Sequence, residues 1–236
     1  MQDLAASLNT LLRRWQEVDP DRPERPFHLA LLAYLSQQGQ VETPKASQED
    51  IAEYMSVLKS DELFQTREDK EAALGRIIED LRKDLLLPYG PYPEIQVVVC
   101  RTKRVDARGR LLGCCTKEEQ LNGCDAGAGT TYYAKTDGRR IVFAGLMASE
   151  KAREARLAIL GVEVPSLTLF TTLHEFGHVL WINRNTRYQF DEAKKFYEKA
   201  VSVVDSKVVE EANVALGDSD YAEFVASLFA LNSIGF

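Results

Sequence analysis

Histidine is the scarcest chemistry-bearing residue of this chain, with only three in 236 residues. Cysteine is also rare: the four cysteines include none of the C-x-x-C pairs that structural zinc sites usually show. No run of roughly 18 or more apolar residues is present, which excludes a transmembrane helix among the expected elements. The sequence also has no internal repeat and no low-complexity tract, so it does not indicate a repeat architecture.

The charge pattern excludes two classes of partner. The net charge is −7 and the basic residues are scattered, so we expect no nucleic acid and no anionic membrane as a partner. The N-terminus lacks a basic start followed by an apolar stretch and a cleavage site, so it does not indicate a Sec-type signal peptide. We therefore predict a cytoplasmic protein, although specialised export signals leave no such pattern. An apolar fraction of 45% is ordinary for a folded core.

The first ninety residues are predicted to be helical throughout. Apolar residues recur at helical spacing, and glycine, proline and polar loops separate the segments. The expected helices cover about 4–15, 26–39, 48–60 and 67–87. The stretch "PYGPYP" that follows them is the strongest domain boundary. We therefore predict a helical N-terminal region, 1–90, that selects a substrate or partner or covers the cleft, and a catalytic domain, 91–236.

The pattern after the boundary changes to strands. "EIQVVVCRTKRV" is rich in β-branched residues, and "TTYYAKTDGRRIVFAG" reads as two strands joined at Asp137-Gly138. From residue 149 to the end the pattern is helical again. Strands followed by helices predict an α+β fold, in which a small mixed or antiparallel sheet packs on an active-site helix.

The segment "TLFTTLHEFGHVLWI" carries two of the three histidines. Ser166 is a credible N-cap for a helix that runs to about residue 183, and on it His174 and His178 lie one turn apart on the same face. With a third ligand, the two imidazoles can hold Zn²⁺ and leave one coordination position for water. Glu175 beside them can accept the proton of that water, which makes it the candidate catalytic base.

The alternative is a pair of satisfied core histidines. Apolar side chains surround this helix on nearly every side, so it is expected to be buried. Three ionisable groups on a buried helix are costly unless something binds them, which favours the metal site.

The third ligand has to be a carboxylate or a cysteine, because no histidine follows His178. His28 is far upstream and reads as a partly buried helical residue. Glu198 lies beside Lys194 and Lys195 on the polar face of an amphipathic helix, which indicates a solvated glutamate.

Glu223 is the preferred third ligand. It belongs to an apolar helix, and its own face carries small residues that allow two helices to approach closely: Ala226, Ser227 and Ala230. The alternative is a capping box, with Asp220 as N-cap and Glu223 as its partner.

With these residues in place, the last seventy residues or so resemble the glutamate-zincin metallopeptidases. "HEFGH" followed by "YAEFVASLFALN" is similar to the catalytic domain of anthrax lethal factor and to the Pro-Pro endopeptidases, and also to metallopeptidases that cleave phage repressors. The resemblance implies a zinc peptidase with His174, His178 and Glu223 as metal ligands and Glu175 as general base. It also implies that a peptide or protein substrate lies along an edge strand.

One departure from that family concerns the group that stabilises the oxyanion. The lethal-factor-like enzymes have a tyrosine before the glutamate ligand, where this chain reads "VALGDSD". Tyr221 and Tyr188 are candidate substitutes, and each also fits a half-buried aromatic residue. The oxyanion donor is therefore unassigned.

Two alternative functions remain open, and one of them involves the cysteines. Thiols that serve no site are the favoured interpretation of Cys100, Cys114, Cys115 and Cys124. If one of them were the third ligand, the chain would resemble the peptide deformylases, whose accompanying motifs are absent here. A regulatory or interaction protein that binds zinc without catalysis is the other alternative, and Glu175 argues against it. The sequence does not indicate an oligomeric state.

Overall fold

The structure is a computed structural model, and it describes eleven stretches of the chain. They are residues 2–18, 27–38, 41, 43–59, 67–89, 94–100, 128–133, 138–144, 166–182, 190–204 and 218–235. Helices supply most of these residues: α1 (Gln2–Val18), α2 (Phe27–Gln38), α3 (Gln48–Lys59), α4 (Arg67–Leu85), the short 3-10 helix η2 (Leu87–Tyr89), α6 (Leu167–Ile182), α7 (Asp191–Val203) and α9 (Asp218–Ser233). No helix in these stretches combines the length and the apolar character needed to cross a bilayer.

The four N-terminal helices are confirmed. Apolar spacing set their buried faces: in α1, for example, Leu4, Leu8 and Leu12 are all buried. The start of α3 is fixed by Ser47, because the backbone N–H of Asp50 donates to the Ser47 hydroxyl at 3.1 Å. Sequence periodicity therefore located these elements correctly.

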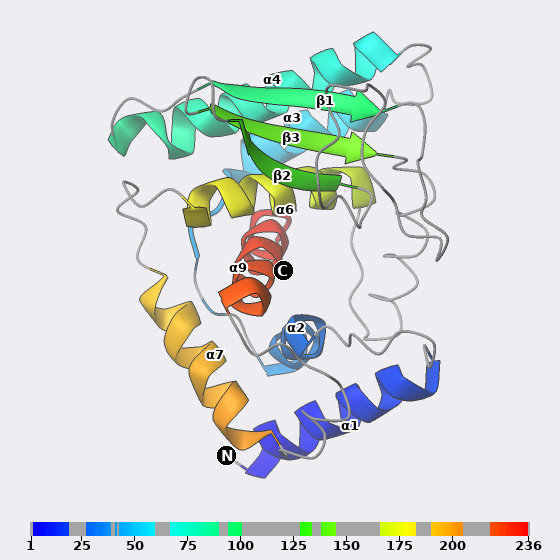
Figure 1. Cartoon of the computed structure of the whole chain (residues 1–236), viewed down its shortest axis with the longest axis vertical. Helices are drawn as coiled ribbons and strands as arrows, with labels where there is room; N and C mark the ends of the chain where they lie inside the picture. Colours follow the sequence, from blue (N-terminus) through cyan, green and yellow to red (C-terminus); the bar gives the residue numbers. More distant parts are fainter. Residues whose placement is uncertain are drawn as a thin grey trace.

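Three short strands form a small mixed sheet. They are β1 (Ile95–Cys100), β2 (Ala128–Tyr133) and β3 (Gly138–Ala144), in the order β1-β3-β2. The predicted antiparallel pairing is confirmed for β2 and β3, whereas β1 runs parallel to β3. The expected turn at Asp137 falls outside the described residues. In Figure 1 the sheet lies at one end of the molecule, with α6 next to β2.

The expected α+β fold class is wrong for the described residues, which form a predominantly α-helical fold. The fully buried residues lie on helices or in their short connections, and none of those described comes from a strand. In β1, Ile95 and Val97 are only partly buried where they pack against this core. The reason is that α6 packs along α9 and further helices pack on this pair, while the small sheet contacts α6 and α4 (Figure 1).

The helices before and after residue 90 share one hydrophobic core. In particular, α2 contacts α9, while α3 and α4 contact α6. The C-terminal end of α9 is also held by the segment before α3: Asn232 Nδ2 donates to Val41 O at 2.8 Å, and the Ala46 N–H donates to Ser233 Oγ at 3.1 Å. The division of the chain at residue 90 stays a prediction, and the N-terminal helices support the helices of the C-terminal part.

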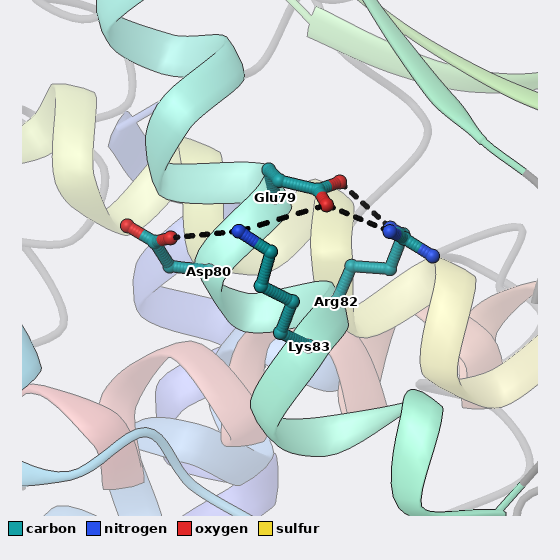
Figure 2. Close-up of polar contacts among 4 residues, drawn as sticks. All are labelled: Glu79, Asp80, Arg82 and Lys83. Atoms are coloured by element: carbon teal, nitrogen blue, oxygen red, sulfur yellow. Dashed lines mark hydrogen bonds and ion pairs between the residues drawn. The ribbon is translucent and has the colours of Figure 1, made fainter.

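Charged side chains occupy the outer surface of α4. Arg82 donates from Nε and from a terminal guanidinium nitrogen to the two carboxylate oxygens of Glu79, both at 2.7 Å (Figure 2). Lys83 lies 3.8 Å from Glu79 and 4.0 Å from Asp80. The hydrogen bond from Arg82 is the main cause that lowers the pKa of Glu79 below its ordinary value.

Candidate metal centre

Helix α6 begins where the sequence predicts. The Leu169 N–H donates to the Ser166 hydroxyl at 3.2 Å, and the Phe170 N–H donates to the Ser166 carbonyl at 2.9 Å. Ser166 is therefore confirmed as the N-cap. From this start the helix carries His174 and His178 one turn apart on the same face.

Helix α9 supplies the third side chain, Glu223. The helix begins at Asp218, two residues before Asp220, so the capping box in which Asp220 is the N-cap is not formed. Close helix packing brings Glu223 to the histidines: a Cβ placed on Gly177 of α6 would be 2.7 Å from the Cα of Ala226 on α9. The two backbones thus touch one turn from Glu223, as the small residues of α9 predict.

Three side chains converge at this crossing. The Nε2 atoms of His174 and His178 are 3.1 Å apart, and each lies 3.2 Å from one carboxylate oxygen of Glu223. The imidazole planes are nearly perpendicular, at 88°. Among the described residues, His174, His178 and Glu223 are the group that could hold a metal ion.

These distances fit a tetrahedral zinc ion. Ligand bonds of about 2.0–2.1 Å at tetrahedral angles place neighbouring ligand atoms about 3.3 Å apart. The separation of the two Nε2 atoms and the distance from each Nε2 to its nearest Glu223 oxygen, 3.1 to 3.2 Å, are close to that value, although the two histidines approach different oxygens of the carboxylate. Two imidazoles and one carboxylate are also a ligand set used by catalytic zinc sites, with one position left for water or substrate.

The charge of the cluster also favours a cation. Burial raises the pKa of Glu223, but hydrogen bonds with His174 and His178, and the positive charge of the protonated histidines, hold it well below its ordinary value. This direction favours the ionised carboxylate, the form that can bind a metal ion. A carboxylate and two imidazole nitrogens at such short distances need a proton or a metal ion between them, because each carries a lone pair when deprotonated.

The site is buried on one side and reaches solvent on the other. The side chain of His174 is 3% exposed and that of His178 is 14% exposed, while the Glu223 side chain is 40% exposed. Glu175 is buried, on the helical turn between the two histidines. A closed structural zinc site has no need of such access, whereas a catalytic site requires it.

Other residues that the sequence singled out lie elsewhere. Glu198 is confirmed as a solvated glutamate: its side chain is 63% exposed and 3.9 Å from Lys194 on α7. His28 on α2 is half-buried, as expected. Tyr188 falls outside the described residues, as do the cysteines at positions 114, 115 and 124, and Cys100 ends β1.

Tyr221 has the contacts of a core residue. Its hydroxyl donates to the Phe190 carbonyl at 3.4 Å, and its ring centroid lies 4.8 Å from that of Trp181 and 5.2 Å from that of Tyr197. Burial, followed by the charges of Glu198 and Asp191, raises the pKa of Tyr221 to about 12. The hydroxyl is therefore engaged with the backbone of another segment.

Sequence reasoning missed the roles of two residues. Ser227 was noted only for its small size, yet its Oγ lies 2.9 Å from His174 Nδ1. Its position four residues after Glu223, on the same helical face, is the signal that could have revealed this contact. Gly177, between the two histidines, is the point of closest approach to α9.

Comparison with protein-family models, with curated proteins and with solved structures gave no match. The case for a function therefore depends on the residues of the site and on their geometry.

Proposed function

We propose that this protein is a zinc-dependent peptidase. The observation that carries the proposal is the convergence of His174, His178 and Glu223: the two Nε2 atoms are 3.1 Å apart, and each lies 3.2 Å from one of the two carboxylate oxygens of Glu223. Nitrogen and carboxylate ligands in this number suit Zn²⁺, which accepts both and takes four ligands. In this proposal the three side chains are the metal ligands, and a peptide or protein is the substrate.

The proposal assigns a chemical role to the metal and to the residue between the two histidines. When zinc is bound in such a site, it lowers the pKa of a water molecule to about 7 and polarises a carbonyl group. Glu175, which is buried and follows His174 on α6, would accept the proton of the attacking water and pass it to the leaving amine. The residue that stabilises the oxyanion is unassigned, and the core contacts of Tyr221 make it a poor candidate.

The edge of the sheet is the proposed site for an extended substrate. β2 is an edge strand of the described sheet and contacts α6, the helix that carries both histidines (Figure 1). An edge strand presents backbone N–H and C=O groups that can pair with a peptide chain. We therefore propose that the substrate adds to β2 in extended form, which brings a peptide bond towards the metal centre.

The test compares zinc content and cleavage of a mixed peptide library for the wild type and for Glu175→Gln. The substitution keeps the size of the side chain and removes the base. We expect Glu175→Gln to retain zinc and to lose cleavage by at least about 100-fold, the contribution of a general base. Glu198→Gln is the matched control, because it makes the same change on the solvated face of α7 and should keep both properties.

Two other results would favour the two alternative functions, a regulatory zinc protein and a deformylase-like enzyme. A wild type that binds zinc and cleaves no peptide in any library would favour a regulatory zinc protein. Glu223→Ala with full zinc affinity would remove Glu223 as a ligand and favour a deformylase-like site with a cysteine ligand.

A further inference from the structure

The two ring nitrogens of His174 contact different groups. Nε2 lies 3.2 Å from Glu223, while Nδ1 lies 2.9 Å from the hydroxyl of Ser227. His174 and Ser227 are almost completely buried. Protein groups therefore flank the imidazole at both of its polar atoms.

The contact with Ser227 bears directly on metal binding. A neutral imidazole carries one proton, and the nitrogen that carries it cannot bind a metal. If Nδ1–H donates to Ser227 Oγ, the lone pair is on Nε2, the atom that faces Glu223 and His178. The opposite tautomer would place a proton where the metal has to bind. A hydroxyl also orients the ring without adding a second negative charge to the buried cluster.

The packing of α9 against α6 sets the position of the Ser227 hydroxyl relative to the His174 ring. Ser227 follows Glu223 by one turn on α9, so the ligand and the partner of His174 belong to the same helical face. Ala226, next to Ser227, touches the backbone of α6 at Gly177. The spacing of the two helices is thus fixed at the level where the hydroxyl reaches the ring.

We propose that Ser227 is a positioning residue of the metal centre, which selects the Nδ1–H tautomer of His174 and holds its ring towards the ion. This inference rests on the metal site of the proposed function, and it is independent of the peptidase chemistry. Close packing of α9 against α6 requires only a small residue at position 227, whereas the proposed role requires its hydroxyl group.

The experiment measures zinc affinity by competition with a chromophoric chelator for the wild type, Ser227→Ala and Ser227→Thr. Loss of the partner of a metal-bound histidine typically lowers metal affinity about 10–100-fold, and we expect this loss for Ser227→Ala. Ser227→Thr keeps the hydroxyl and should restore most of the affinity. The visible spectrum of the Co²⁺-loaded protein should change for Ser227→Ala and resemble the wild type for Ser227→Thr.

Ser202→Ala is the matched control. The hydroxyl of Ser202 on α7 is exposed and donates to the Lys199 carbonyl at 2.8 Å, so its removal should leave zinc affinity unchanged. Urea unfolding with excess chelator separates loss of metal affinity from loss of folding. Equal zinc affinity and equal Co²⁺ spectra for the wild type and Ser227→Ala would overturn the inference and leave the proposed function intact. A wild type that binds no zinc would overturn the proposed function itself.

A second measurement needs no variant. Nitrogen NMR of the zinc-loaded wild type identifies the protonated nitrogen of His174. We expect a proton on Nδ1 and the metal on Nε2. A proton on Nε2 would overturn the inference.

Discussion

Gly177→Ala changes the metal centre by adding a single methyl group. The new Cβ would lie 2.7 Å from the Cα of Ala226, 3.0 Å from its carbonyl oxygen and 3.3 Å from its carbonyl carbon. All three are backbone atoms of α9, so no side chain can rotate away to make room.

The size of the effect follows from those distances. Carbon atoms pack at about 3.5–4.0 Å, so α9 has to withdraw by about 1 Å. Overpacking of this kind costs about 1–3 kcal/mol, and the better helix propensity of alanine returns about 1 kcal/mol, which leaves a net loss of roughly 1 kcal/mol. A shift of that size also moves Glu223 from its 3.2 Å distances to a separation at which it no longer fits a tetrahedral ion with the histidines. We therefore expect zinc affinity to fall by about tenfold or more.

Urea unfolding and chelator competition measure the two effects. Gly75→Ala is the matched control: on α4, a Cβ at Gly75 has no described heavy atom within 4 Å. That change should stabilise the protein by about 0.4–1 kcal/mol and leave zinc affinity unchanged. If Gly177→Ala stabilised the protein as much as Gly75→Ala and bound zinc as the wild type does, the close approach of α6 and α9 would not set the geometry of the site.

Three further predictions concern stability in urea unfolding. Ser166→Ala removes the N-cap of α6 and should cost about 1 kcal/mol, which Ser166→Asp should largely recover; equal stability of all three proteins would refute the cap. Asn232→Ala removes the hydrogen bonds from Nδ2 to Val41 O and Thr43 Oγ1 and should cost about 1–3 kcal/mol; no loss would show that this contact does not hold α9. Glu79→Gln should cost well under about 1 kcal/mol near neutral pH, because the Glu79 side chain is 41% exposed and its charge is screened. Because the pKa of Glu79 is lowered in the folded state, the stability that its charge contributes is present above the ordinary carboxyl pKa and is lost as pH falls through the lowered value. A stability difference between the wild type and Glu79→Gln that persisted in strong acid would contradict a stabilising ion pair between Glu79 and Arg82.

Much of the site could be predicted from the sequence because its elements are local. The spacing of His174 and His178 fixes their common face on any helix, and Ser166 marks where that helix begins. Glu223 was preferred because its helix is apolar and its own face carries small residues, whereas Glu198 lies beside lysines on a polar face. Its arrival at the histidines depends on the contact of Gly177 with Ala226, which no spacing along the chain reveals.

The fold class could not be predicted because it depends on which elements share a core. The strands were located correctly, but their pattern does not show how large a share of the chain is helical. The sequence did not show which helices of the first ninety residues pack against the C-terminal part, where α2 packs on α9 while α3 and α4 pack on α6. Long-range contacts such as the hydrogen bond from Asn232 to Val41 join these helices, and spacing along the chain does not reveal them.

The most direct test of the three-ligand site is the zinc content of the purified protein and of its ligand variants, measured by elemental analysis after dialysis against dilute zinc. The geometry predicts one zinc per wild-type chain and loss of that zinc in His174→Gln, His178→Gln and Glu223→Gln, with Glu198→Gln retaining it. A wild type without zinc, or full zinc content in Glu223→Gln, would contradict the account.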